Sequence, residues 1–297
     1  MRLDGVAVID KPAGWTSHDV VAKARGVLGT RKVGHSGTLD PDATGVLVLG
    51  VGRATRLLRY VTGLPKSYEA EIVLGVETDT LDSTGRVTAR HDMAEVSAEQ
   101  AGEAAAALTG EILQTPPMVS AVKVGGRRLH TLARAGLEVE REARRVTVHR
   151  FDVAPVPGTG AVLRAVVDCS SGTYVRVLAA DLGRALGGGA HLRNLRRTAV
   201  GSFGLADARL VESAEVLPMA HAVKHLAGVR VGPEVAAEVA HGRVLGLGRL
   251  GVAETIEAAA ASGPWAVHDS EGELLAVYER FRDGAKPAVV VTGPPGS

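Results

Sequence analysis

Cysteine and aromatic residues are scarce in this chain of 297 residues. Aromatic side chains make up 3% of the sequence, so valine, leucine and alanine must fill most of the core. Cys169 is the single cysteine, which excludes an internal disulfide and a zinc site built from cysteines. The ten histidines are scattered and form no spaced ligand pair with Asp or Cys, so the sequence indicates no metal site.

Long apolar runs and a strong net charge are also missing. No stretch approaches the roughly 20 apolar residues that cross a bilayer, and the first residues form no apolar signal core. We therefore expect a cytoplasmic protein without a membrane partner. The formal net charge is +1, so a nucleic-acid partner would need a local basic stripe. The basic runs 141–145 and 193–197 are candidates, although such runs are also typical of a solvated face.

The order of the predicted elements favours an α+β fold, because strands and helices follow one another at irregular spacing. Apolar periodicity predicts strands at 5–10, 46–51, 66–75, 119–124, 146–153 and 161–169, and helices at 17–28, 54–64, 98–109 and 174–186. The pattern of predicted elements changes after about residue 225. From there we predict a helix that starts at Pro233 and short strands at 229–231, 265–268, 274–280 and 287–292. We expect two domains, 1–225 and a small, mainly β domain at 226–297.

The segment from residue 30 to residue 45 is polar, rich in glycine and without periodicity, so we expect a loop that joins regular elements. Asp40 precedes Pro41, which restricts the backbone of the aspartate. The glycines allow tight turns and a close approach of a ligand. Such a loop can hold one accessible carboxylate still. Hydrogen bonds within a turn are the alternative explanation for Asp40 and Thr38.

Five segments, in the same order, resemble the TruB family of pseudouridine synthases. They span about residues 5 to 205 and read GVAVIDKPAGWTS at 5–17, GHSGTLDPDATG at 34–45, KSY at 66–68, SGTYVR at 171–176, and GAH at 189–191 followed by LRR at 195–197. The resemblance implies a pseudouridine synthase fold with a central mixed, mostly antiparallel sheet, and a PUA-like C-terminal domain that binds RNA. It also implies isomerisation of a uridine to pseudouridine in the tRNA T loop (position 55 of the tRNA), with no cofactor.

The resemblance implies a role for each matching residue. The aspartate before proline is the catalytic residue of the family, which corresponds to Asp40. Arg176 would form an ion pair that lowers the pKa of Asp40. Tyr68 would stack on the target base, and Tyr174 would pack on the other side of that base. Leu195 would be a pocket contact, and His35 would stack in the place that the flipped base has left. Asp42 departs from the family, which commonly has a larger apolar residue there, and we expect it to face solvent.

The resemblance also implies an insertion at about 116–145 that grips the T arm, where these residues would neutralise phosphates: Lys123, Arg127, Arg128, Arg141, Arg144 and Arg145. We expect tRNA as the partner and a monomer that needs no partner protein. One alternative is a non-catalytic RNA-binding or tRNA-folding protein on the same fold. A guide-RNA-dependent enzyme is another, which the basic insertion disfavours. A hydrolase built on Ser36, His35 and Asp40 is rejected, because neighbours in one tight loop cannot easily place a nucleophile, a base and a residue that orients the base in the required order.

Overall fold

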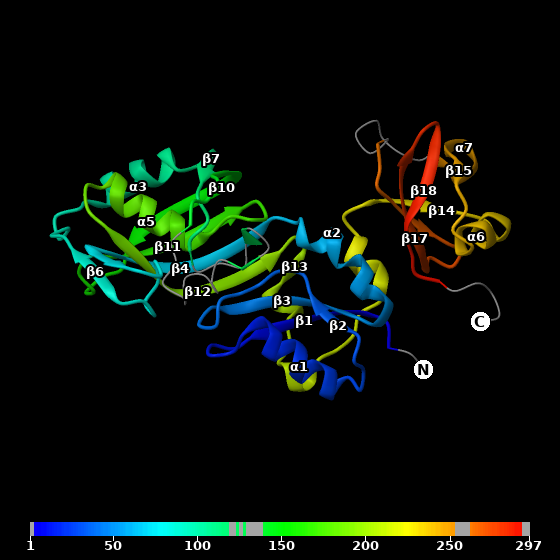
Figure 1. Cartoon of the computed structure of the whole chain (residues 1–297), viewed down its shortest axis with the longest axis horizontal. Coiled ribbons are helices and arrows are strands. Elements are labelled where there is room, and N and C mark those ends of the chain that lie inside the picture. Colours follow the sequence, from blue (N-terminus) through cyan, green and yellow to red (C-terminus); the bar gives the residue numbers. More distant parts are fainter. Residues whose placement is uncertain (1–2, 119–122, 125–126, 129–138, 253–261, 293–297) are drawn as a thin grey trace.

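The computed structural model describes residues 3–118, 123–124, 127–128, 139–252 and 262–292. Two β-sheets organise these residues, a large one in the first part of the chain and a small one near the C-terminus (Figure 1). Among the described residues, no helix is long and apolar enough to cross a membrane.

In the part of the chain that the structure describes, the large sheet has nine strands. Its main path runs β1 (Gly5–Lys11), β3 (Thr44–Val51), β12 (Ala190–Val200), β4 (Lys66–Leu74), β11 (Val162–Cys169), β10 (Arg144–Pro155) and β7 (Gly110–Gln114). Two short strands lie off this path, β2 (Val33–His35) beside β3 and β13 (Phe203–Gly204) beside β12. Among the described strand pairs of this sheet, only that of β12 with β3 is parallel, which confirms the prediction of a mixed, mostly antiparallel sheet.

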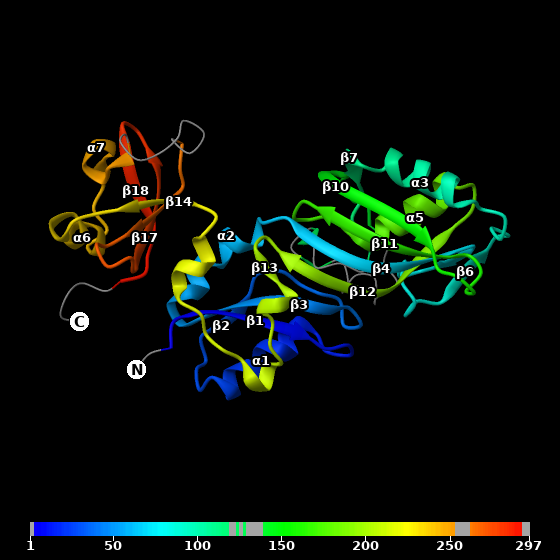
Figure 2. The same ribbon diagram turned by 180° about the vertical axis from the view of Figure 1, so that it is seen from behind.

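Helices cover this sheet where the apolar periodicity predicts them. α3 (Ala98–Ala107) and α5 (Val175–Ala185) lie on one face and share a core with β4 and β11 (Figures 1 and 2). α1 (Ser17–Val27) packs on one face of β1 and β3. Side chains cap both α1 and α3, since Thr16 and Ser97 each form a complete capping box.

Two local predictions need correction, and a third is only partly described. The loop at 30–45 contains the strand β2, which pairs with β3 and so satisfies its backbone hydrogen bonds in the sheet. The helix predicted at 54–64 is a 3₁₀ segment, η1 (Gly52–Leu57), followed by the short helix α2 (Leu58–Thr62), which ends ahead of Pro65. The strand predicted at 119–124 lies mostly outside the described residues. Its last two residues form β8 (Lys123–Val124), which pairs with β9 (Arg127–Arg128).

Short elements complete the first part of the chain. A hairpin of β5 (Val76–Thr78) and β6 (Val87–Arg90) follows β4 directly. Three 3₁₀ segments lead to the small sheet: η2 (Leu205–Asp207), η3 (Val211–Ser213) and η4 (Met219–Val223).

The small sheet packs on both of its faces. Its strands follow the order β14 (Ala227–Arg230), β16 (Trp265–His268), β17 (Leu274–Phe281), β18 (Gly284–Val290) and β15 (Leu245–Gly246). One face shares a core with α6 (Pro233–Ala240) and α7 (Leu247–Leu250). The other face joins an apolar cluster that contains Leu57 and Val61 of η1 and α2. The two sheets are therefore linked by packing near α2.

Candidate active site

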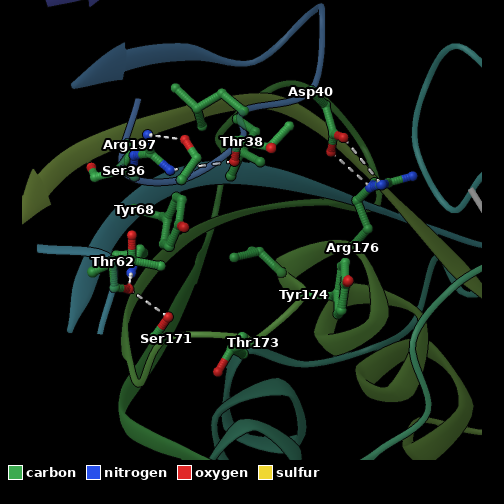
Figure 3. Close-up of a pocket in the computed structure, with 16 residues that line it drawn as sticks. Ser36, Thr38, Asp40, Thr62, Tyr68, Ser171, Thr173, Tyr174, Arg176 and Arg197 are labelled. Atoms are coloured by element: carbon green, nitrogen blue, oxygen red, sulfur yellow. Dashed lines mark hydrogen bonds and ion pairs between the residues drawn. The ribbon is translucent and has the colours of Figure 1, made fainter. Parts of the chain in front are cut away.

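A cavity of about 250 Å³ opens between the loop after β2 and the first turn of α5. Figure 3 shows Asp40 and Arg176 facing each other on one side of this pocket, with Tyr68 and Tyr174 nearby. Five of the residues predicted for the site line it: Asp40, Tyr68, Tyr174, Arg176 and Leu195. The other lining residues are Ser36, Gly37, Thr38, Leu39, Thr62, Lys66, Ser171, Gly172, Thr173, Val175 and Arg197.

A bulged strand forms one wall of the pocket. β12 runs between β3 and β4, and its register with β4 shifts between Arg193 and Arg196. Asn194 within this shift has a φ of 53°, a conformation that asparagine tolerates better than most residues. The bulge lies immediately before Leu195, which lines the pocket. Bulges next to active sites commonly change the direction of a side chain, and this bulge accompanies the position of Leu195 in the pocket wall.

Asp40 and Arg176 form a two-point ion pair. The Nε and Nη2 groups of Arg176 donate to the two carboxylate oxygens of Asp40 at 3.0 and 3.3 Å. The third donor, Nη1, bonds the carbonyl of Thr80 at 2.9 Å and a carboxylate oxygen of Asp82 at 3.2 Å. The Arg176 side chain is 5% exposed, whereas that of Asp40 is 41% exposed. The arginine is thus fixed from behind while the carboxylate of Asp40 faces the pocket.

Arg176 lowers the pKa of Asp40, as expected, but the net shift of this pKa is upward. Burial raises the pKa of this carboxyl above its ordinary value, and the neighbouring Arg176 opposes that shift without overcoming it. Asp82 adds a smaller repulsion that also raises the pKa. Asp42 is exposed, as expected, and makes the smallest contribution of the same sign. The desolvation of the loop therefore outweighs the ion pair.

Two buried cations hold the loop that carries Asp40. Arg197 is 1% exposed and donates to the carbonyls of Val46, Gly37 and Thr38 at 2.7, 3.2 and 3.5 Å. Lys11 is fully buried, and its ammonium group donates to three carbonyls, including that of Pro41 at 2.8 Å. Burial lowers the pKa of Lys11 to about 8. These bonds fix the backbone on both sides of Asp40.

The two tyrosines reach the pocket from different elements. Tyr68 lies on β4, opposite Arg197 of β12, and is 7% exposed. Burial raises the pKa of Tyr68, so its hydroxyl stays protonated near neutral pH. Tyr174 is the residue before the first turn of α5, and no side chain caps that helix. Instead, Gln114 of β7 bonds both the backbone N–H and the carbonyl of Tyr174.

His35 lies on β2 and is not among the residues that line the pocket. Its ring meets that of His18 edge to face, with 5.2 Å between the centroids. Burial lowers the pKa of His35, and the neighbouring His18 lowers it further. A neutral ring at neutral pH suits a stacking role better than a charge-based one.

The predicted RNA contacts are only partly described. Lys123, Arg127 and Arg128 belong to the small hairpin of β8 and β9. Arg144 and Arg145 are exposed on β10. Arg141 donates to the carbonyl of Pro116 at 3.1 Å and so engages its own chain.

The second basic run, at 193–197, is not a free positive stripe. Arg193 pairs with Glu71 at 2.6 Å and Arg196 pairs with Asp10 at 2.8 Å. Arg197 is buried, so all three arginines of this run bind groups of the protein itself.

Sequence reasoning missed three residues that organise the site: Asp82, Gln114 and the buried Arg197. Asp82 follows the β5 strand in a turn, where Thr80 and Thr84 bond its second carboxylate oxygen. Its partner Arg176 lies 94 residues away, so no local pattern connects the two. For Arg197 the only signal was its place in the LRR motif, which does not distinguish a buried arginine from an exposed one.

Comparison with protein families matches most of the large-sheet region. A model described as "TruB family pseudouridylate synthase (N terminal domain)" matches residues 25–175, and one described as "tRNA pseudouridylate synthase B C-terminal domain" matches residues 176–229. A protein of Arthrobacter sp. (strain FB24) named tRNA pseudouridine synthase B is 49% identical over 97% of this chain and 96% of its own. The protein of the same name from Thermobifida fusca (strain YX) is 46% identical over 98% and 99%.

Solved structures show the same architecture. A chain of a Cbf5-Nop10-Gar1 complex matches 98% of this chain and 85% of its own with a TM-score of 0.72 and 26% identity. A chain of an H/ACA RNP bound to a substrate RNA containing 2'-deoxyuridine has the same TM-score, covers 98% of this chain and 86% of its own, and is 24% identical. This last likeness concerns the fold alone.

Proposed function

The chain belongs to the TruB family of pseudouridylate synthases and is an isomerase that converts uridine in tRNA to pseudouridine; we propose that it acts on the T loop and that Asp40 carries the reaction. The observation that carries this proposal is the Asp40–Arg176 pair, because it presents one oriented carboxylate to a pocket lined by two tyrosines. The relatives named tRNA pseudouridine synthase B support the substrate class.

The reaction moves the base on its own sugar. The bond from N1 to the ribose C1′ breaks, the base turns, a bond from C5 to C1′ forms, and the C5 proton leaves while N1 gains one. No electron acceptor or donor is consumed. A carboxylate at Asp40 can assist the departure of the base and later accept the C5 proton. The two-point bond from Arg176 keeps this carboxylate in one orientation throughout.

The pocket suits a base that has left its stack. A flipped uridine has lost its stacking neighbours, and an aromatic platform returns roughly 1–3 kcal/mol per base. Tyr68 is the proposed platform, Tyr174 and Leu195 are proposed to contact the base, and His35 is proposed to fill the gap in the RNA. The basic residues of the insertion, Lys123, Arg127, Arg128, Arg141, Arg144 and Arg145, are proposed to bind phosphates of the T arm.

We further propose that residues 1–225 and 226–297 form two domains, the second PUA-like and able to contact RNA. A five-stranded sheet with its own apolar core supports this division. The protein is proposed to act in the cytoplasm as a monomer that needs no partner protein.

Tritium release tests the proposal. An unmodified tRNA with 5-³H-uridine loses its label from the isomerised position, because the C5 hydrogen leaves. We expect purified protein to release one equivalent, and a tRNA with cytidine at the T-loop position to release none. Asp40→Asn should lower the rate about 1,000-fold, whereas the matched variant Asp42→Asn, with its exposed side chain in the same loop, should stay active. Binding without release by the wild type would favour the RNA-binding alternative.

A further inference from the structure

The strand β7 ends where the chain leaves the large sheet for the insertion. Gln114 is the last residue of β7 and lies opposite Arg144, the first residue of β10. The insertion therefore lies between these two residues in the sequence. Although it stands at this edge, Gln114 is 2% exposed, and its side chain points into the protein toward α5.

Both ends of the Gln114 amide bond one residue of the pocket. Its Oε1 accepts the backbone N–H of Tyr174 at 2.7 Å, and its Nε2 donates to the carbonyl of Tyr174 at 3.2 Å. The two residues are 60 positions apart in the sequence. The amide thus bonds the main chain of Tyr174 at two points, as a neighbouring strand would, and holds it in one place.

The position of Tyr174 determines how α5 begins. Tyr174 is the N-cap residue of the helix, and its own side chain accepts no hydrogen bond from the backbone of the first turn. Its carbonyl already accepts the N–H groups of Val177 and Leu178, and these bonds start the helix. Arg176, which orients the Asp40 carboxylate, lies in that first turn. The Gln114 amide therefore supports both Tyr174 and Arg176.

We propose that Gln114 is a positioning residue for the isomerisation, which fixes Tyr174 and the first turn of α5 against the carboxylate of Asp40. This inference rests on the proposed function. Gln114 is absent from the lining of the pocket, so it acts through Tyr174 and not by touching the base. Its loss should slow the chemical step and leave the affinity for tRNA unchanged, because the Gln114 side chain is buried toward α5 whereas Arg144, its partner on β10, is exposed.

Two variants separate this role from simple packing. Gln114→Met keeps the length and removes both hydrogen bonds, which leaves the N–H of Tyr174 without a partner. Gln114→Glu keeps the shape and the acceptor but places a second acceptor opposite the carbonyl of Tyr174. Gln100→Met is the control, since Gln100 also bonds a backbone N–H, that of Ser97, but at the exposed start of α3 and not in the lining of the pocket.

The readouts are the single-turnover rate of tritium release with excess enzyme, the Kd for tRNA by filter binding, and the melting temperature. We expect Gln114→Met to lower the rate constant about 10- to 100-fold at an unchanged Kd, because small misplacements at a reacting centre have effects of this size. Gln114→Glu should also be slow, and Gln100→Met should react like the wild type.

Other outcomes decide against the proposal. A folded Gln114→Met protein with the rate of the wild type overturns it, as does a loss of affinity that accounts for the whole loss of rate. If Gln114→Met does not fold, Gln114→Glu decides by the same criteria. A wild-type protein that releases no tritium overturns the proposed function itself, whereas an active wild type with equally active Gln114 variants overturns only the role of Gln114.

Discussion

At Asp40, burial and ion pairing act on the same carboxyl in opposite directions. Burial is the larger effect, so the pKa of Asp40 is raised even though Arg176 contacts both oxygens. The proposed reaction needs the ionised carboxylate. We therefore expect the single-turnover rate to fall on acidification at a higher pH than the ordinary pKa of an aspartate would give. A pH profile of tritium release measures this acid limb, and Asp42→Asn should leave it nearly in place.

The same shift has a consequence for stability. A carboxyl whose pKa is raised by folding stabilises the fold below its unfolded pKa, and this contribution is lost as the pH rises through the folded pKa. At neutral pH the ionised Asp40 is thus a cost to the fold. Asp40→Asn, although inactive, should melt at a higher temperature than the wild type at neutral pH, and the difference should vanish in acid. A lower melting temperature at neutral pH would show that the ion pair outweighs burial.

The residues that line the pocket were predictable only where a motif carries them. Asp40, Tyr68, Tyr174 and Arg176 each lie in a short motif of consecutive residues, and the structure gathers them in one pocket. Asp82 and Gln114 were not predictable, because each acts on a residue 60 or more positions away. Only the folded chain brings such partners together.

Among the elements, the site depends on how closely β3 and β12 approach. Gly45 of β3 is paired with Arg197 of β12 and has a φ of 99°, which side-chain-bearing residues rarely adopt. A Cβ at this position would overlap the carbonyl oxygen of Arg197. We expect Gly45→Ala to lower the free energy of unfolding by about 2–4 kcal/mol, from backbone strain and overpacking together. Urea denaturation followed by circular dichroism measures the change.

A second glycine provides the matched control. Gly102 lies inside α3, and an added Cβ there would meet nothing within 4 Å. Gly102→Ala should therefore raise the free energy of unfolding by about 0.5–1 kcal/mol, as is usual inside a helix. Equal effects of the two substitutions would contradict the assigned close approach of β3 and β12.

Periodicity predicted the elements that bury one regular face. The alternation along β4 appears as buried Tyr68, Ala70, Ile72 and Leu74, and α1 and α3 lie where the apolar periodicity predicts helices. It failed for β2, which has three residues and is too short to show a period. It also placed 54–64 in one helix, because a 3₁₀ turn and an α-helix bury similar positions.

At the scale of the whole molecule, the question is whether the two sheets are stable independently. The strand β17 contributes Leu275 and Tyr278 to the core of the small sheet. Its other face contributes Leu274 and Val277 to the cluster that contains Leu57 of η1. Arg56, in the same 3₁₀ segment, donates to the carbonyl of Val290 at 2.7 Å. Neither part can unfold without exposing the apolar surface of the other.

This shared cluster predicts a single unfolding transition. The chain has two tryptophans, Trp15 beside the large sheet and the buried Trp265 in the small one, so Trp15→Phe and Trp265→Phe each leave one reporter. Within each background, Leu274→Ala should lower the free energy of unfolding by about 2–5 kcal/mol, the usual cost of a cavity. Fluorescence in urea should show the same loss from both reporters, because the cluster couples them. A loss confined to the Trp265 reporter would mean that the small sheet unfolds alone. A change there would then not reach α2, whose last residue, Thr62, lines the pocket.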